Sequence, residues 1–382
     1  MKKKNILIIS FDFCLEAGGI QNTSFLLAKE FSKFVNVFTF CPADGHSPEN
    51  LSVRSFKGEY GNTISEQDKA RTQSAGMIER LHLEYKFDYV LVLHYLLAFP
   101  ALHLKNKYNV PYGVMTYGND VMKLTLKRKL QHPRSAIKII CERKKILNNA
   151  SQVYSCTNFT KSLVEELSSN KNIHVIHPPI GIENVAYSEK YFKAPILLSV
   201  GRLVERKGYQ NVIKALPDVL KSMPSLKYII AGTGEYESQL KHLVRQMNLS
   251  SFVEFKGRIT EEEKCKLMSE CGLFIMPSFI IKEKYSVEGF GLSMLEANMF
   301  GKFVISSLSG GIPEAVKEDV TGFLVGENDI TGIARAILKF YDDTFTYDPS
   351  LCVEWAMEHD ISNITKQYMS VICKQIELQD VH

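Results

Sequence analysis

The stretch VEGFGLSMLEAN, Val287–Asn298, places two carboxylates, Glu288 and Glu296, eight residues apart. Glu288 lies in a glycine-broken loop, and Glu296 lies about two turns into the helix that we predict to follow. The N-terminus of such a helix offers unpaired N–H groups and the positive end of a dipole, which can hold a phosphate. Carboxylates so close to a phosphate suit neutral hydroxyl groups, as on a sugar and a ribose. The stretch therefore indicates a site for a nucleotide sugar.

On both sides of this stretch, short apolar runs alternate with helical patterns. The predicted strands are Asn5–Ser10, Asn36–Phe40, Tyr89–His94, Tyr112–Thr116, Gln152–Cys156, His174–His177, Pro195–Val200, Lys227–Ala231, Val253–Lys256, Leu273–Met276 and Phe303–Ser306. Such alternation is typical of parallel sheets covered by helices on both faces. We therefore predict an α/β fold of two Rossmann-like, doubly wound domains that face each other across a cleft. Ligands should bind at the carboxyl ends of the strands.

Breaks in this pattern predict the domain boundaries. The strand series restarts at Ala194-Pro195, after Pro178-Pro179 and Tyr187–Lys193, and we expect the interdomain linker there. This gives a first domain over residues 1–190 and a second over residues 194–348. A last helical pattern follows Asp348-Pro349 and runs from Cys352 to about Ile376. We expect the segment 349–382 to pack back on the first domain.

The composition of the 382 residues is that of an ordinary globular protein, with 45% hydrophobic and 23% charged residues. No run of 18 or more apolar residues occurs, so no transmembrane helix is expected. The start Met1–Ser10 resembles a buried strand more than a signal peptide. The eight cysteines are scattered without metal-ligand spacing, which favours a reduced, cytoplasmic protein.

Positive charge is concentrated in the first half of the chain. Residues 1–190 hold 25 Lys and Arg against 17 Asp and Glu, and the segment 123–145 alone holds nine bases and one acid. Its second half places Ile137, Ile140, Cys141 and Leu147 on one face of a predicted helix, although Lys144 interrupts that face. The segment is either a solvated helix face or a surface for anionic lipid or an anionic acceptor. Nucleic acid is disfavoured as a partner, because no aromatic residues are interleaved with the bases.

In each half of the chain, one glycine-containing motif follows the first strand. Gly19, in Ala17–Gln21, belongs to a turn that is either only a turn or a place where backbone N–H groups approach a phosphate. In Gly201–Gly208, Arg202 can grip a phosphate with two hydrogen bonds and Lys207 can add a point charge. A solvated loop is the alternative, but bases directly behind a buried strand favour an anion site.

Two further glycine turns lie in the second half. Gly232-Thr233-Gly234 begins like a dinucleotide fingerprint, but Glu237 holds the position of the third glycine, so a nicotinamide site is disfavoured. Ser309–Glu314 is a second glycine turn that opens a helix near the same predicted cleft. Gly322–Val325 is interpreted as structural.

Taken in order from Gly201 to Val325, these motifs resemble those of the GT-B glycosyltransferases of glycosyltransferase family 4, and the resemblance extends over nearly the whole chain. It implies a retaining hexosyl- or N-acetylhexosaminyl-transferase that moves a sugar from a UDP- or GDP-linked donor to an acceptor hydroxyl. It also implies a role in bacterial cell-surface polysaccharide or glycolipid biosynthesis, with no metal cofactor. The acceptor, a carbohydrate or a lipid-linked molecule, would bind the first domain, and the donor the second.

The resemblance also implies roles for individual residues. Arg202 and Lys207 match the residues that hold the donor diphosphate, Glu288 matches the one that contacts the sugar hydroxyls, and Glu296 the one that binds ribose. Lys256–Ile259 matches the segment that lines the base. The implied donor-binding residues are Gly19, Arg202, Lys207, Arg258, Ile259, Glu288, Gly289, Phe290, Gly291, Leu292 and Glu296.

One departure from the family pattern concerns the first domain. Many members carry His-Gly-x-Asp after a strand, and the matching segment here is Tyr117-Gly118-Asn119-Asp120. Tyrosine can donate a hydrogen bond but cannot carry a proton near neutral pH as imidazole can. We therefore expect Tyr117 to position the sugar, beside the catalytic Glu288, Arg202 and Lys207, and Asp120 to be a polar cleft residue. His94 ends another strand and is either structural or part of the same cleft.

Two alternatives to a transferase remain open at this point. A non-catalytic subunit that binds nucleotide sugar for a partner glycosyltransferase would share these motifs, as would a nucleotide-sugar epimerase of similar fold. With a transferase, the basic segment 123–145 predicts peripheral contact with an anionic membrane from the cytoplasmic side.

Overall fold

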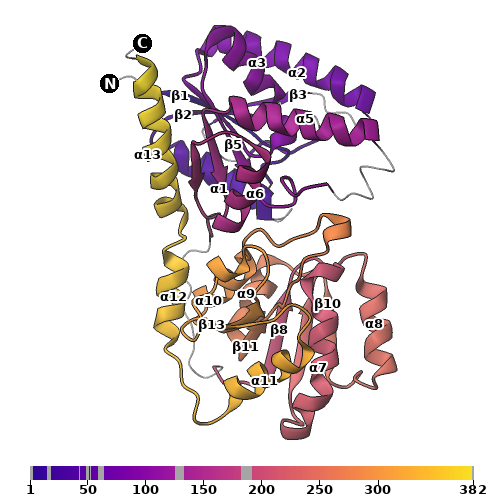
Figure 1. Ribbon diagram of the computed structural model, residues 1–382. Coiled ribbons are helices and arrows are strands. Elements are labelled where there is room, and N and C mark those ends of the chain that lie inside the picture. The colour runs from indigo at the N-terminus through magenta and orange to yellow at the C-terminus, as the bar shows by residue number, and fades with distance from the viewer. Residues whose placement is uncertain are drawn as a thin grey trace. The chain divides into compact units, whose positions relative to one another are not determined.

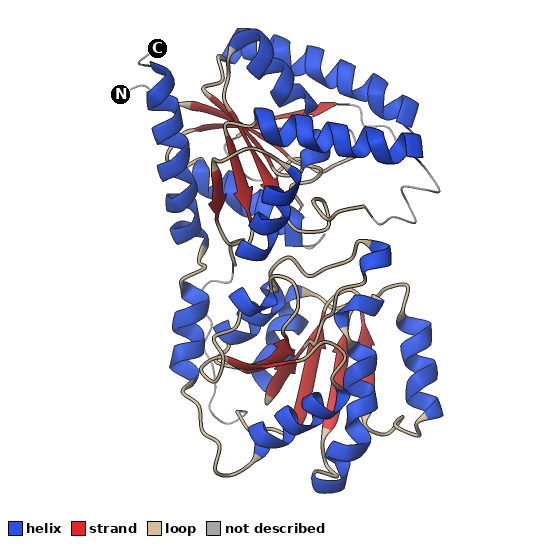
Figure 2. Cartoon of the chain, viewed as in Figure 1, coloured by secondary structure: helices blue, strands red, loops and turns tan. Residues whose placement is uncertain are grey.

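The structure is a computed structural model that describes residues 3–14, 19–42, 44–48, 51, 53–58, 64–124, 133–181 and 192–380. The chain forms two compact units, one of Met1–Gly181 with Ile361–His382 and one of Ile182–Asp360. Each is built on a parallel sheet flanked by helices (Figures 1 and 2). The predicted α/β fold with two Rossmann-like sheets is confirmed.

In the described part of the first unit, the sheet has seven parallel strands in the order β3-β2-β1-β4-β5-β6-β7. The strands are β1 Asn5–Ile9, β2 Asn36–Pro42, β3 Arg54–Gly58, β4 Tyr89–Val92, β5 Tyr112–Thr116, β6 Gln152–Ser155 and β7 Ile173–Val175. The helices are α1 Gly19–Phe31, α2 Ile64–Tyr85, η1 Tyr95–Leu97, α3 Phe99–Tyr108, α5 Pro133–Asn149, α6 Asn158–Leu167 and α13 Ile361–Asp380.

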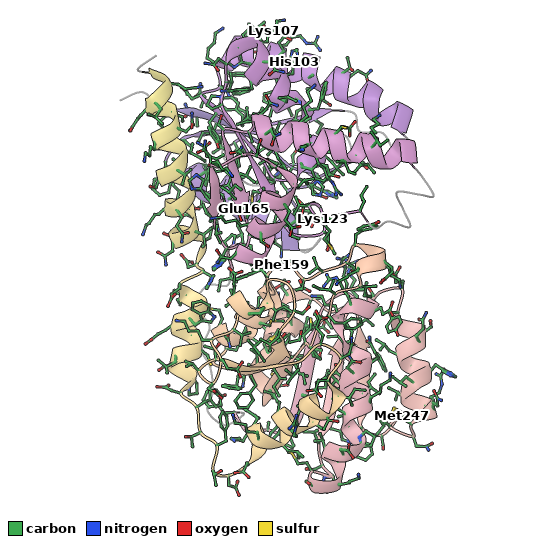
Figure 3. All side chains as sticks on the ribbon, in the orientation of Figure 1. His103, Lys107, Lys123, Phe159, Glu165 and Met247 are labelled. Carbon is green, nitrogen blue, oxygen red and sulfur yellow. The ribbon has the colours of Figure 1, made fainter. Side chains whose placement is uncertain are left out.

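The two faces of this sheet have separate cores, because successive strand side chains point to opposite faces. Leu7 and Ile9 of β1 pack in a cluster with residues of α2, α3 and α5. Ile6 and Ile8 pack in a second cluster with residues of α1 and α13. A polar contact also joins two of the covering helices: Glu79 of α2 accepts hydrogen bonds from His103 and Lys107 of α3 (Figure 3).

In the described part of the second unit, the sheet has six parallel strands in the order β10-β9-β8-β11-β12-β13. The strands are β8 Ile196–Val200, β9 Lys227–Ala231, β10 Val253–Gly257, β11 Leu273–Ile275, β12 Phe303–Ser307 and β13 Gly322–Val325. The helices are η3 Glu205–Lys207, α7 Tyr209–Ser222, α8 Glu237–Gln246, α9 Glu261–Glu270, η4 Lys282–Lys284, α10 Leu292–Met299, η5 Ile312–Glu314, α11 Ile330–Tyr341 and α12 Pro349–Met357.

The C-terminal segment is two helices, where the sequence pattern predicted one. Helix α12 packs against α10 in the second unit, and α13 packs against α1 in the first. Ile364, Tyr368 and Ile372, spaced four residues apart, are buried on α13, so one helical face joins the first unit's core. The predicted linker cannot be described, because residues 182–191 lie outside the described residues.

The basic segment is described only in part, since residues 125–132, including Lys127, Arg128 and Lys129, lie outside the described residues. Helix α5 forms as predicted, and Leu147 of the predicted apolar face is buried, but Ile137 is 63% exposed and Cys141 is exposed. The reason is that α5 packs on the core through adjacent residues near its end, Ile146 and Leu147. Within the described ranges, no helix is long and apolar enough to cross a membrane.

Candidate functional site

A buried ion cluster around Glu288 forms the centre of the candidate site in the second unit. Glu288 Oε2 accepts a hydrogen bond from Lys207 Nζ at 2.7 Å and another from Arg206 Nη1. The three side chains are only 8–15% exposed. Two cations therefore hold one carboxylate, and the cluster carries a surplus of positive charge.

Two loops at the carboxyl ends of β8 and β11 bring these groups together. Arg206 and Lys207 lie on η3, directly after β8, and Glu288 lies in the long loop between β11 and α10. The loops are joined by a hydrogen bond from Phe279 N to Arg206 O, 2.8 Å long. Gly208 ends η3 with φ +79°, and a Cβ there would lie 2.1 Å from Pro277 O. Only glycine allows both this conformation and this close approach.

The glycine turn after β12 fixes the backbone of Glu288. Gly311 N donates to Glu288 O at 3.1 Å, and a Cβ on Gly310 would lie 2.6 Å from the same oxygen. Gly289 follows Glu288 in its loop, and Phe290 is buried with its ring 5.5 Å from that of His359. The turn at Ser309–Glu314 is thus part of the Glu288 site.

The start of α10 has the geometry that the sequence predicted. Gly291, with φ +118°, is the N-cap residue of this helix, and Leu292 is its first residue. The helix N-terminus therefore follows directly on the loop that carries Glu288.

The charges of the cluster set the pKa values of its members. Burial by itself would raise the pKa of Glu288, but Lys207 and Arg206 outweigh it and bring this pKa to about 2, below the ordinary 4.5. Burial lowers the pKa of Lys207, despite the attraction of Glu288. Glu288 is hence a carboxylate at neutral pH, which accepts hydrogen bonds and has no proton to give.

Arg202 lies between β8 and η3 and is exposed. Its charge contributes to the lowered pKa of Lys207, so it lies close enough to add to the positive field of the cluster. The neighbouring loop after β9 supports this position, since Leu203 N donates to Thr233 O at 2.9 Å. A Cβ on Gly232 would lie 2.0 Å from Gly201 O, so this contact of two loops needs glycine.

Glu296, on α10, is paired with a lysine that the sequence did not single out. Lys264 Nζ, on α9, lies 3.2 Å from Glu296 Oε1 and 2.8 Å from Glu261 Oε2. Burial opposes the charge of Lys264, but the two carboxylates outweigh burial and hold its pKa above the usual range. The Glu296 carboxylate is thereby fixed, with 21% of its side chain exposed.

The segment predicted to line the base follows β10. Gly257, with φ +66°, accepts a hydrogen bond from Gly232 N at 2.7 Å, which ties this segment to the loop after β9. Arg258 is exposed and Ile259 is partly buried. These residues share the carboxyl edge of the sheet with the Glu288 cluster.

Tyr117 and Asp120 lie together after β5 in the first unit. Asp120 Oδ1 accepts a hydrogen bond from Tyr117 N at 2.9 Å, and Asp120 Oδ2 is buried without a hydrogen-bond partner among the described residues. The Tyr117 hydroxyl donates to Met115 Sδ at 3.6 Å. Burial raises the pKa of Tyr117 well above its ordinary value, so the phenol stays protonated.

His94 follows β4 and caps η1, where its Nδ1 accepts from Leu96 N at 3.3 Å. Its ring packs between those of Phe11 and Tyr95, and burial lowers its pKa. Arg143 of α5 also acts on His94 electrostatically and stacks on Tyr95. Arg143 of α5 therefore lies close to the carboxyl edge of the first unit's sheet.

Gly19 is the first residue of α1, and residues 15–18 before it lie outside the described residues. In the second unit the structure thus brings together Lys207, Glu288 and the predicted glycine turns. Sequence reasoning missed Arg206, although it is the neighbour of Lys207 in a motif with three bases. It also missed Lys264, for which the sequence holds no comparable signal.

Comparison with known proteins agrees with this geometry. Residues 183–357 match the family described as glycosyl transferases group 1. This range contains β8 to α12, and with them Arg206, Lys207, Glu288 and Glu296.

Curated relatives match over part of their length. The chain is 34% identical over 149 residues to the GDP-mannose-dependent monoacylated alpha-(1-6)-phosphatidylinositol monomannoside mannosyltransferase of Corynebacterium glutamicum, which is 39% of this chain and 38% of that protein. It is 32% identical over 165 residues to a putative colanic acid biosynthesis glycosyltransferase of Escherichia coli, which is 42% of this chain and 40% of that protein.

Solved structures match over nearly the whole chain and share its fold. Sucrose-phosphate synthase from Thermosynechococcus elongatus has a TM-score of 0.78 at 19% identity, over 98% of this chain and 100% of that one. HepE from Anabaena, solved in complex with UDP and glucose, has a TM-score of 0.74 at 18% identity, over 97% of this chain and 99% of that one. The chain thus has the GT-B fold, and its second unit matches the group 1 glycosyl transferase family.

Proposed function

We propose that the protein is a retaining glycosyltransferase that moves a sugar from a UDP- or GDP-linked donor to the hydroxyl of a carbohydrate or lipid-linked acceptor. The observation that carries this proposal is the Glu288 carboxylate held by Lys207 and Arg206 at the carboxyl edge of the second sheet. In a nucleotide sugar, a diphosphate is attached to a sugar. The two cations suit the diphosphate, and the carboxylate suits the sugar hydroxyl groups.

Each charged group has a separate role in this proposal. Lys207 and Arg206, with the nearby Arg202, stabilise the negative charge that develops on the leaving diphosphate. Glu288 accepts hydrogen bonds from the sugar, and Glu296 accepts them from the ribose. The chain's own cations thereby replace a divalent metal as counter-charge.

The anomeric configuration of the sugar is retained if the acceptor attacks from the same face of the sugar that the diphosphate leaves. The leaving phosphate oxygen then receives the proton of the acceptor hydroxyl. This route needs positioning and diphosphate stabilisation more than a protein base. It suits the Glu288 carboxylate, whose pKa of about 2 makes it a weak base.

Two relatives support the donor class and the pathway class. The mannosyltransferase from Corynebacterium is described as GDP-mannose-dependent, and the Escherichia coli relative is assigned to colanic acid biosynthesis. HepE was solved with UDP and glucose. We therefore propose a nucleoside-diphosphate donor and a role in cell-surface polysaccharide or glycolipid synthesis.

The basic segment supports a peripheral contact with an anionic membrane at its cytoplasmic face. Ile137 and Cys141 of α5 are exposed next to the exposed Lys144 and Lys145. Exposed apolar and basic side chains on one helix suit the surface of an anionic bilayer. Two of the described bases are already paired: Lys123 (Figure 3) lies 2.8 Å from Glu166, and Lys138 lies 3.9 Å from Glu142.

Donor binding tests the core of the proposal. Thermal-shift and ligand-detected NMR measurements with UDP, GDP and their common sugars should find one nucleotide that stabilises the protein, and Lys207→Met should abolish that stabilisation. Matched Lys241→Met, at an exposed lysine on α8, should leave it unchanged. If none of these compounds binds, the proposed function is wrong.

Liposome flotation tests the membrane contact separately. The protein should float with anionic vesicles at low salt, and replacing Lys144 and Lys145 together with Lys127, Arg128 and Lys129 by Gln should abolish flotation. Retained flotation of this variant would contradict the assignment of the basic segment.

A non-catalytic nucleotide-sugar-binding subunit is the second candidate. It is favoured by one observation, the Tyr117 hydroxyl bound to Met115 Sδ at the position where the family carries histidine. Such a subunit would bind the donor tightly but transfer nothing, and Glu288→Ala would leave its biological activity intact in a complementation assay.

A further inference from the structure

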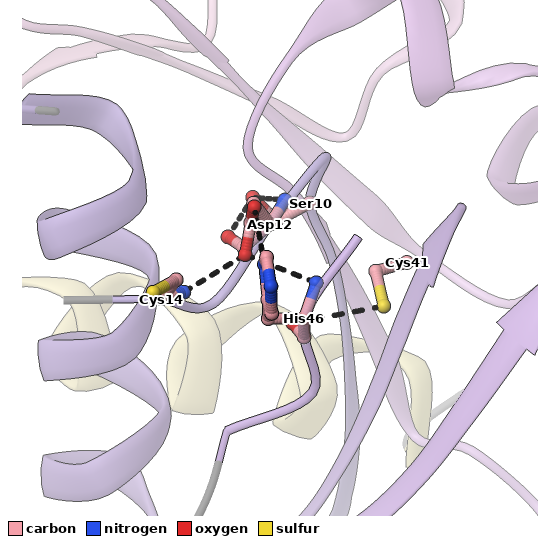
Figure 4. A network of polar contacts seen from close by, with 5 residues as sticks. All are labelled: Ser10, Asp12, Cys14, Cys41 and His46. Atoms are coloured by element: carbon pink, nitrogen blue, oxygen red, sulfur yellow. Dashed lines mark hydrogen bonds and ion pairs between the residues drawn. The ribbon is translucent and has the colours of Figure 1, made fainter. Parts of the chain in front are cut away.

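Asp12 and His46 form a carboxylate–imidazole pair at the carboxyl edge of the first unit's sheet (Figure 4). Asp12 follows β1, and His46 lies in the segment that follows β2. Asp12 Oδ2 lies 3.1 Å from His46 Nδ1. Asp12 Oδ1 accepts from the backbone N–H groups of Cys14, at 2.9 Å, and of His46, at 3.1 Å.

The backbone around this pair is fixed independently of the imidazole. Phe13 N donates to His46 O at 3.0 Å, and a Cβ on Gly45 would lie 2.4 Å from Phe11 O. The segment that carries His46 therefore lies directly against the loop after β1. With the loops held in this way, the contact between Asp12 Oδ2 and the ring chiefly sets the orientation of the ring.

The pair also fixes the hydrogen-bonding role of each ring nitrogen in the neutral form of His46. A carboxylate only accepts hydrogen bonds, so in that form Nδ1–H donates to Asp12 and Nε2 keeps its lone pair. The His46 side chain is 64% exposed, whereas that of Asp12 is 18% exposed. A contact so open to water contributes little stability. The pair is thus suited to present a hydrogen-bond acceptor to a ligand.

The neighbouring polar rings are engaged differently. His94 uses Nδ1 to cap η1, and the Tyr117 hydroxyl donates to a sulfur atom. The His46 side chain instead is largely exposed, at the strand ends where open α/β sheets bind ligands.

We propose that His46 binds a hydroxyl group of the glycosyl acceptor through Nε2, and that Asp12 is the residue that positions the imidazole. The inference rests on the proposed glycosyltransferase function and names a contact of its acceptor site. A neutral acceptor atom suits the hydroxyl-rich surface of a carbohydrate, which donates as readily as it accepts.

Binding of octyl glucoside and octyl mannoside, followed by saturation-transfer NMR, tests the proposal. The wild-type protein should bind at least one of the two, and His46→Ala should weaken this binding about fivefold or more, as expected for one lost hydrogen bond. His46→Gln should retain part of the affinity, because its amide oxygen can reach the position of Nε2. His242→Gln, at an exposed histidine on α8, is the matched control and should change nothing.

The variant Asp12→Asn tests whether Asp12 orients the imidazole ring of His46 or only supports the fold. The amide oxygen can still accept both backbone hydrogen bonds, but the amide N–H₂ now faces Nδ1 and should move the ring proton to Nε2. Imidazole ¹⁵N shifts should report this exchange of tautomer, and glycoside binding should fall as in His46→Ala while the melting temperature stays close to that of the wild type.

The outcomes distinguish this proposal from the proposed function. Glycoside binding that is absent in the wild type, or unchanged in His46→Ala, overturns the role of His46. The melting shift caused by UDP or GDP should be the same in all these variants. Its absence in the wild type would instead overturn the glycosyltransferase assignment.

Discussion

The carboxyl edges of the two sheets carry opposite kinds of polar groups. At the second sheet, Glu288 is buried with Arg206 and Lys207 in a cluster of fixed positive surplus. At the first, Asp12 forms a carboxylate–imidazole pair with His46, whose side chain is 64% exposed. Buried cations suit a diphosphate, and an exposed imidazole suits a hydroxyl group. We therefore propose that the donor binds to the second unit and the acceptor to the first.

The largest effect is expected from removing a cation of the donor site. Lys207→Met should lower turnover by about 10²–10³-fold, the usual loss when one group that stabilises a developing anion is removed. It should also lower the free energy of unfolding by about 1.5–3 kcal/mol, because the buried carboxylate loses one of its two charged hydrogen-bond donors and keeps the other, Arg206. Steady-state kinetics and urea unfolding measure the two effects.

The triple variant Lys207→Met, Arg206→Met and Glu288→Gln is the control for this change. It removes the carboxylate together with both cations that hold it, so no buried charge of this cluster is left unpaired, and stability should recover while turnover stays low. Recovery of turnover would show that Lys207 only supports the fold. The carboxyl edge of the second sheet would then not be a diphosphate site.

Glu288→Gln should lower turnover by about 10²-fold while UDP or GDP affinity changes by less than about threefold. The reason is that Glu288 contacts the sugar and not the nucleotide in our proposal. Calorimetry with the nucleotide and kinetics with the donor give the comparison. An equal loss in both would place Glu288 at the diphosphate instead.

Acid should erase the contribution of Glu288 to stability. Its pKa is lowered from 4.5 to about 2 on folding, so the contribution is fully present above pH 4.5 and is lost as pH falls toward 2. The difference in unfolding free energy between wild type and Glu288→Gln should be about 2–3 kcal/mol at pH 7 and smaller at pH 3. A difference independent of pH would contradict the ion cluster.

Glu296→Gln should weaken nucleotide binding about tenfold and leave turnover at saturating donor nearly unchanged. The same substitution should have no effect on the affinity for 2′,3′-dideoxynucleotides, which lack the ribose hydroxyls. Equal weakening with both nucleotides would mean that Glu296 acts through Lys264 and α9 rather than on the ribose.

Removal of divalent metal should have the smallest effect. In our proposal Lys207, Arg206 and Arg202 supply the counter-charge, so EDTA should leave turnover within about twofold. Dependence on Mg²⁺ or Mn²⁺ would show that these cations do not suffice for the diphosphate.

Most of the fold could be predicted from sequence because its strands are buried on both faces. Runs such as Tyr112–Thr116 and Lys227–Ala231 were predicted with the bounds that the structure shows. The edge strand β3, Arg54–Gly58, could not, since three of its five residues are exposed and it lacks an apolar run. The apolar face predicted for α5 is buried at Leu147 but not at Ile137 or Cys141, because tertiary contacts with the hydrophobic core reach only the end of the helix.

The candidate site was predictable where glycines and charges follow a strand. Lys207, Glu288 and the turn at Gly310-Gly311 are joined as the sequence motifs suggested. The sequence could not predict that Arg206, and not Arg202, binds Glu288, because this depends on how η3 turns after Val204. The pair of Asp12 and His46 joins residues 34 apart with no motif around either, so only the fold reveals it.

The chain completes its first unit last. Helix α13 supplies Ile361, Ile364, Tyr368, Ile372 and Ile376 to a core whose other buried members come from residues before 181. During synthesis the first sheet must therefore wait, with that face uncovered, until the whole second unit and the helix behind it have left the ribosome. A stop codon at Ile361 would spare every residue of the Glu288 site and still expose the hydrophobic core of the first unit, a state in which aggregation competes with folding.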